Sequence, residues 1–136
     1  LEKGYRSYGA DITREHRPDQ AGLGFAVSKV KTDYLGHDAL ATPPQTQRRM
    51  VSLTSAFPFG SPNPGSPVRN QAGETIGYTA SSDFGYTVGK TITYAWLEPE
   101  YTEAGTQVVI QHFDRSVPAE VAMDPLYDPE GTKIRR

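Results

Sequence analysis

Residues 85–91, Gly-Tyr-Thr-Val-Gly-Lys-Thr, contain the residue types that bind phosphate in nucleotide-binding loops. A Walker loop has four residues between its glycines, whereas three residues separate Gly85 from Gly89. The triplet at residues 83–85, Asp-Phe-Gly, imitates the magnesium motif of protein kinases, but the chain has no His-Arg-Asp loop and is far too short for that fold. Nucleotide hydrolysis and phosphoryl transfer are therefore not predicted.

The other residues with catalytic or metal-binding chemistry do not form a recognisable set. The three histidines stand singly, without the i,i+4 pairing of a zinc site. Their positions are His16, His37 and His112. Two aspartates and a glutamate cluster near the C-terminus, but prolines follow both aspartates, which favours two turns over a calcium loop. These acidic residues are Asp124, Asp128 and Glu130. We predict no catalytic residue and no metal ligand within the chain.

Composition and spacing exclude further classes of function. Residues 22–24, Gly-Leu-Gly, lack the third glycine of a dinucleotide-binding turn, so a flavin site is not predicted here. Fourteen basic and sixteen acidic residues give a net charge of -2, without a basic run that could follow a nucleic acid. The longest uncharged stretch, residues 50–68, carries four prolines and cannot span a membrane. The absence of cysteine fits a reducing compartment, so we expect the cytoplasm or an organelle matrix.

Strand patterns dominate the chain from Arg48 onward. Short apolar groups recur at residues 50–53, 76–78 and 92–96, the last with period two. Residues 108–113 and 117–123 flank the turn at Asp114 and Arg115, which predicts a hairpin. We predict a mainly β fold in which four to six antiparallel strands close into a small barrel or sandwich.

A short α/β segment is expected before this β domain. Residues 1–9 have the spacing of a helix turn, residues 21–27 that of a short strand, and residues 34–40 that of another helical turn. The prolines at positions 43 and 44 predict a boundary near residue 45, dividing the chain into domains 1–44 and 45–136. The loop at residues 57–67 is either a binding element or a variable surface insertion. Because Leu1 continues a segment, we expect a piece of a longer protein.

Motifs along almost the whole chain resemble the C-terminal part of the T-protein superfamily, which includes the glycine-cleavage aminomethyltransferase. The sarcosine and dimethylglycine dehydrogenase branch is the most similar, above all at residues 83–92. In chain order the matching segments are residues 1–6 (Leu-Glu-Lys-Gly-Tyr-Arg), 8–11 (Tyr-Gly-Ala-Asp), 21–27 (Ala-Gly-Leu-Gly-Phe-Ala-Val), 33–40 (Asp-Tyr-Leu-Gly-His-Asp-Ala-Leu), 48–53, 73–77, 83–92 and 125–129 (Pro-Leu-Tyr-Asp-Pro).

The resemblance implies a three-lobed folate enzyme whose last lobe is a β-barrel and whose tetrahydrofolate lies in a channel between lobes. In the family, a Glu in a Leu-Glu-x-Gly motif binds the pterin ring, and this Glu falls on Glu2. An ionised carboxylate can accept two hydrogen bonds from an aminopyrimidine edge. A second folate contact falls on Lys31, where the glycine-cleavage members carry Arg, although Lys lacks the planar guanidinium.

The resemblance also implies that the reacting groups lie outside this chain. The family's catalytic aspartate belongs to the N-terminal half of the module, and FAD belongs to a separate domain of the dehydrogenases. We therefore expect an isolated chain that is inactive and whose partners are folate and the N-terminal lobes of the same polypeptide. Two alternatives stay open: a non-catalytic assembly barrel, and part of a folate-dependent demethylase. The amine substrate and the oligomeric state are not indicated.

Overall fold

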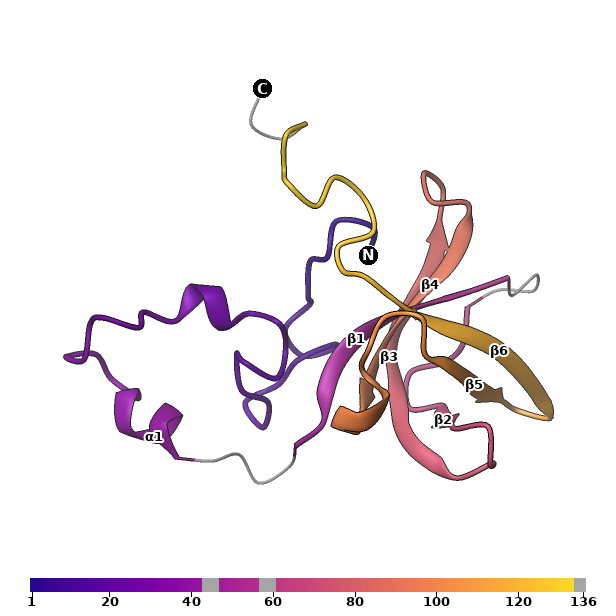
Figure 1. The fold of residues 1–136 in the computed structure, drawn as a ribbon, viewed down its shortest axis with the longest axis horizontal. Helices are drawn as coiled ribbons and strands as arrows, with labels where there is room; N and C mark the ends of the chain where they lie inside the picture. The colour runs from indigo at the N-terminus through magenta and orange to yellow at the C-terminus, as the bar shows by residue number, and fades with distance from the viewer. Residues whose placement is uncertain (43–46, 57–60, 134–136) are drawn as a thin grey trace.

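Six strands in the second two thirds of the chain form one closed antiparallel barrel. The computed structural model describes residues 1–42, 47–56 and 61–133. The strands are β1 Arg49–Ser55, β2 Pro67–Arg69, β3 Thr75–Gly85, β4 Lys90–Leu97, β5 Gln107–His112 and β6 Arg115–Ala122. They pair in the order β1-β4-β3-β2-β5-β6, and β6 pairs with β1 to close the barrel (Figure 1). The predicted small antiparallel barrel is confirmed.

Alternate strand residues fill the interior of the barrel. Val51 and Leu53 of β1 are buried together with Ala95 and Leu97 of β4. Strands β2, β3, β5 and β6 contribute the remaining buried members, which are Val68, Ile76, Val108, Ile110, Val117, Ala119 and Val121. Because successive side chains of a strand point to opposite faces, this interior uses one residue in two.

The opposite face of β1 and β4 is also buried. Met50, Tyr94 and Trp96 form a second apolar cluster with Ala21 of the N-terminal segment. Leu1, Ile12 and Leu23 pack against the same cluster. The period-two pattern predicted for residues 92–96 therefore marks, at Tyr94 and Trp96, a face that the N-terminal segment covers, outside the barrel interior.

The N-terminal segment contains little regular structure, and Figure 1 shows it looping beside the barrel. Its described elements are the 3-10 helix η1 (Gly24–Ala26) and the short helix α1 (His37–Ala41). The predicted helical turn at residues 34–40 is confirmed by α1, whereas the predicted helix in residues 1–9 is wrong. Gly4 has φ +77° and Gly9 φ +95°, and the carbonyls of Leu1 and Tyr5 bond to Tyr94 of β4.

The strand predicted at residues 21–27 is also wrong. Gly22 has φ +73°, and the N–H of Leu23 donates a hydrogen bond to the carbonyl of Pro18 at 2.7 Å. A turn followed by η1 therefore replaces an extended run. The only bridge described in this region joins Tyr8 to Ile12.

The hairpin predicted around Asp114 and Arg115 is confirmed by β5 and β6, which pair from Gln107–Glu120 to His112–Arg115. A 3-10 helix, η2 (Pro99–Tyr101), precedes them. The sequence missed β2, which has three residues and begins with a proline. The predicted boundary near residue 45 and part of the loop at residues 57–67 fall on 43–46 and 57–60, outside the described residues.

Within the described part of the chain, every helix is too short or too polar to cross a membrane.

Candidate functional site

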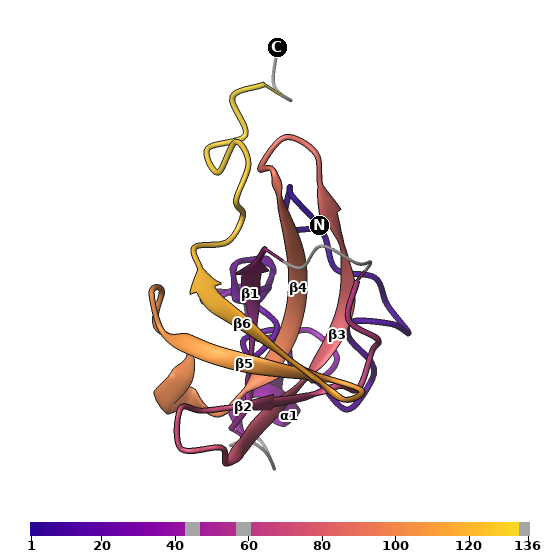
Figure 2. The ribbon, with the colours of Figure 1, turned by 90° about the vertical axis from the view of Figure 1, so that its right-hand side faces the viewer.

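Glu2 lies against the turn that joins β3 to β4. Its Oε1 accepts hydrogen bonds from the backbone N–H groups of Thr87 at 2.6 Å and Val88 at 3.0 Å. Figure 2 shows the N-terminus beside this hairpin. The Val88 N–H, followed by the N–H and hydroxyl of Thr87, holds the pKa of the Glu2 carboxyl below its usual value. Glu2 is therefore an ionised acceptor at neutral pH.

A cavity of about 390 Å³ surrounds Glu2. The β3–β4 hairpin forms one wall and the first three residues of the chain form the other. Its lining residues are Leu1, Glu2, Lys3, Asp83, Phe84, Gly85 and Tyr86. Phe84 and Tyr86 are 45% and 88% exposed, with ring centroids 5.3 Å apart in an edge-to-face arrangement. The cavity thus combines a charged acceptor with exposed aromatic surface, which suits a flat heterocycle with N–H donors.

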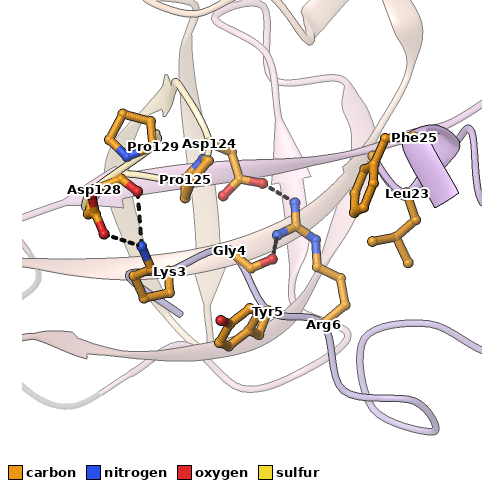
Figure 3. A pocket seen from close by; sticks show the side chains of 11 residues that line it. Lys3, Gly4, Tyr5, Arg6, Leu23, Phe25, Asp124, Pro125, Asp128 and Pro129 are labelled. Atoms are coloured by element: carbon orange, nitrogen blue, oxygen red, sulfur yellow. Dashed lines mark hydrogen bonds and ion pairs between the residues drawn. The ribbon is translucent and has the colours of Figure 1, made fainter. Parts of the chain in front are cut away.

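The first six residues of the chain (the N-terminal strip) also border a larger cavity, of about 810 Å³ (Figure 3). It is lined by residues 3–6, by Gly22, Leu23 and Phe25, and by residues 124, 125, 128 and 129 of the C-terminal tail. Lys3 Nζ donates to Asp128 Oδ2 and to the Asp128 carbonyl, each at 2.9 Å. This ammonium group is the largest cause of the lowered pKa of Asp128, which is about 2. The cavity is therefore bordered by a paired lysine and carboxylate.

Arg6 provides the second ion pair of this cavity. Its guanidinium bonds to the carboxylate of Asp124 and to the carbonyl of Gly4, and it lies 4.6 Å from the ring centroid of Tyr94. The Arg6 side chain is only 6% exposed, and its Nε has no hydrogen-bond partner among the described residues. Asp124 also accepts a bond from the hydroxyl of Ser52 at 3.0 Å. These contacts fix the N-terminal strip and the C-terminal tail to β1 and β4.

Asp11 attaches the following loop to the barrel. Its carboxylate accepts the N–H groups of Ser7 at 2.8 Å and Ser81 at 3.0 Å, and its carbonyl accepts the indole N–H of Trp96 at 3.0 Å. The β3–β4 register shifts between Thr79 and Ser82, so the N–H of Ser81 can leave the ladder and bond to Asp11. His16 stacks on Trp96 with ring centroids 4.0 Å apart.

Lys31, the second folate contact implied by the resemblance, lies on an exposed loop. Its side chain is 61% exposed, and its Nζ is 3.7 Å from Asp33 Oδ1. Lys31 is not among the described residues that line either cavity. The described structure therefore places Glu2 at a cavity but does not bring Lys31 to it.

Sequence reasoning missed Lys3 and Arg6, and it interpreted Asp124 and Asp128 only as turn residues. The partners in these two ion pairs are 125 and 118 residues apart. In the sequence, two cations three residues apart and two aspartates four residues apart do not by themselves identify these pairs. Among the described residues, no group of three or more His, Cys, Asp or Glu is placed to hold a metal ion.

Comparisons with known proteins agree on one family. Residues 48–128 match the sequence model of the glycine cleavage T-protein C-terminal barrel domain. Rat dimethylglycine dehydrogenase is 30% identical over 99% of this chain, which spans 16% of that protein. An aminomethyltransferase from Symbiobacterium thermophilum is 34% identical over 88% of this chain, which spans 32% of that protein.

A solved structure shares the fold. The crystal structure of the glycine cleavage system aminomethyltransferase T from Bartonella henselae superposes with a TM-score of 0.81 at 23% identity, over 94% of this chain and 37% of that one. The family match covers more than half of the chain, and it coincides with the closed barrel. The chain therefore belongs to the glycine cleavage T-protein family, with residues 48–128 as its C-terminal barrel domain.

Proposed function

We propose that this chain is the C-terminal portion of an aminomethyltransferase-type module and helps to bind tetrahydrofolate. The whole protein would be a flavoenzyme similar to dimethylglycine or sarcosine dehydrogenase, in which folate captures the released one-carbon unit. The observation that carries the proposal is the ionised Glu2 beside an aromatic-lined cavity, in a chain that aligns over 99% of its length with dimethylglycine dehydrogenase. Residues 1–44 would end the folate-binding lobe, and residues 45–136 would form the barrel.

The residues around Glu2 fit a reduced pterin. The carboxylate is kept charged by the amides of Thr87 and Val88, so it can accept charge-assisted hydrogen bonds from an aminopyrimidine edge. Phe84 and Tyr86 offer aromatic surface next to it. Lys31 would add a cationic contact once the remainder of the module is in place. Tetrahydrofolate, when bound, supplies the nitrogen that accepts the one-carbon unit.

FAD does not fit the described residues of this chain. A dinucleotide turn links a strand to a helix whose N-terminus binds the pyrophosphate. Here Gly22 lies in a turn with φ +73°, and the element that comes directly after it, η1, is a 3-10 helix of three residues. The flavin and the amine oxidation would therefore belong to other parts of the polypeptide.

The remaining lobes of the same polypeptide are the proposed protein partner. Several large apolar side chains on the N-terminal segment are more than two thirds exposed, which is costly for a segment that stays in water. They are Tyr5, Tyr8, Phe25, Val30 and Leu35. Burial of this surface against the preceding lobes would also enclose the folate that Glu2 contacts.

The first test is a calorimetric titration of the 136-residue chain with 5-methyltetrahydrofolate. We expect binding, and we expect Glu2→Gln to weaken it about tenfold or more, because a hydrogen bond to a charged group contributes roughly 1.5–3 kcal/mol. Glu100→Gln is the matched control, since it removes the same charge from an exposed position on η2. Equal affinities for the chain and both variants would contradict a folate role for Glu2.

A non-catalytic assembly barrel is the second candidate, and two observations favour it. Oε1 of Glu2 already accepts hydrogen bonds from two backbone N–H groups, and Lys31 is paired with Asp33. Both side chains thus have partners within the protein. Product analysis of the full-length protein separates the two functions. With dimethylglycine or sarcosine and tetrahydrofolate, the folate proposal predicts methylene-tetrahydrofolate. Free formaldehyde as the only one-carbon product would support the assembly role.

A further inference from the structure

The glycine-rich stretch at residues 85–91, which fails as a nucleotide loop, holds an anion of the protein itself. It forms the turn between β3 and β4, and its Thr87 and Val88 N–H groups converge on Oε1 of Glu2. Consecutive backbone N–H groups directed at one point form a small anion-binding concavity. The occupant here is a carboxylate 85 residues from Thr87 in the sequence.

The glycines of this turn are explained by the carboxylate and by the turn geometry. A Cβ on Gly85 would lie 3.1 Å from Glu2 Oε1 and 2.7 Å from Ile92 Cδ1, so both side chains would have to shift to admit it. Gly89 has φ +71°, a conformation that L side chains rarely adopt, and its N–H closes the turn on the Gly85 carbonyl at 2.7 Å. One glycine supplies space and the other supplies backbone freedom.

We propose that the β3–β4 turn is a positioning element for the folate site, in which the Thr87 and Val88 amides orient the Glu2 carboxylate toward the ligand. This inference rests on the proposed folate role of Glu2. An ionised carboxylate has about four lone-pair sites, so two backbone bonds leave acceptor capacity for an aminopyrimidine. Glu2 and hairpin residues 83–86 line the same cavity. A ligand bound there would therefore contact both the Glu2 carboxylate and the β3–β4 hairpin that orients it.

Through this contact the barrel would support the folate site, although the β3–β4 turn itself contributes no catalytic group. Glu2 belongs to the strip before the barrel, and the turn belongs to the matched barrel domain at residues 48–128. A carboxylate whose Oε1 already accepts two N–H hydrogen bonds loses fewer rotamers when the ligand binds than a free one. The turn would therefore improve affinity through preorganisation, and Thr87 and Val88 are positioning residues.

The contact is tested first without ligand, by NMR on the 136-residue chain during an acid titration. We expect the amide protons of Thr87 and Val88 to shift with the same apparent pKa as the Glu2 carboxyl. That shared titration should disappear in Glu2→Gln. Amide shifts that do not follow Glu2 in the unsubstituted chain would overturn the inference, and this measurement needs no substitution in the turn.

The positioning role is tested with Gly85→Ala, beside Gly24→Ala, whose Cβ would approach no atom closer than 3.6 Å. In Gly85→Ala we expect the Glu2 pKa to return toward 4.5 and the affinity for 5-methyltetrahydrofolate to fall about fivefold, as for one lost hydrogen bond. Gly24→Ala should change neither. A displaced Glu2 pKa with unchanged affinity would overturn the positioning role.

The failure of this inference and that of the proposed function are distinguishable. If Glu2→Gln leaves folate affinity unchanged while the Thr87 and Val88 amides follow the Glu2 carboxyl, the proposed function fails and the turn has only a structural contact. If Glu2→Gln abolishes binding while the amides do not follow Glu2, the folate role stands and the positioning inference fails.

Discussion

A single tyrosine connects three parts of this molecule. The Tyr94 ring is fully buried on the outer face of β4, and its hydroxyl lies 3.1 Å from the Leu1 carbonyl and 3.2 Å from the Tyr5 carbonyl. The same hydroxyl is 3.4 Å from Arg6 Nη1, and Arg6 pairs with Asp124 of the C-terminal tail. The sequence identifies Tyr94 as a strand residue, but its partners in the first six residues of the chain leave no local signal.

Removal of this hydroxyl tests the connection. We expect Tyr94→Phe to lower the free energy of unfolding by about 1–2 kcal/mol, because buried acceptors lose their donor. Burial raises the pKa of Tyr94 to about 12 from 10.0, so between these values the unfolded state binds fewer protons than the native state. Stability contributed by Tyr94 is therefore present below pH 10 and decreases as pH rises through 12. Urea unfolding from pH 8 to 12 measures both effects.

The control for this experiment is Tyr86→Phe, because Tyr86 is 88% exposed. It should match the unsubstituted chain at neutral pH and retain the alkaline loss attributed to Tyr94. If Tyr94→Phe and Tyr86→Phe show the same alkaline decrease, the burial of the Tyr94 hydroxyl does not control it.

At the scale of elements, the strands that were predicted correctly are those whose own residues show a local strand or turn pattern. Residues 49–55, 90–97 and the β5–β6 hairpin alternate apolar and polar positions or lie beside turn residues, so their strand character is readable from neighbours alone. The N-terminal segment has similar short patterns, but glycines with positive φ and bonds to the barrel decide its path. The same limit applies to the site, because the Glu2 contact with Thr87 spans 85 residues.

Gly77 shows how closely two strands pack. A Cβ on Gly77 of β3 would lie 2.0 Å from the carbonyl oxygen of Trp96 and 2.8 Å from Leu97 Cδ2 on β4. Backbone cannot yield there without breaking the β3–β4 ladder, so we expect Gly77→Ala to destabilise the fold by about 3 kcal/mol. Gly24→Ala should unfold near the temperature of the unsubstituted chain. Thermal unfolding followed by circular dichroism checks both, and equal midpoints would contradict the close approach.

At the scale of the whole molecule, the barrel and the N-terminal segment form one packed unit. The segment covers Met50, Tyr94 and Trp96, which lie on the outer face of the barrel. Asp11 and His16 anchor it through the Trp96 indole N–H and the Trp96 ring. The family match begins only at residue 48, so the matched domain does not include the residues that cover this face.

A fragment that begins at residue 48 should therefore fold as a barrel but self-associate. Without residues 1–47, Trp96 and its neighbours form an exposed apolar patch, and such patches drive association. Because the chain has one Trp, its fluorescence reports this face directly, and we expect a red-shifted emission with dye binding and concentration-dependent sedimentation. Trp96→Thr in the same piece should reduce the association. A monomeric barrel with the emission of the full chain would mean that residues 1–47 are not needed to protect this face, and that the boundary near residue 45 separates two independent units.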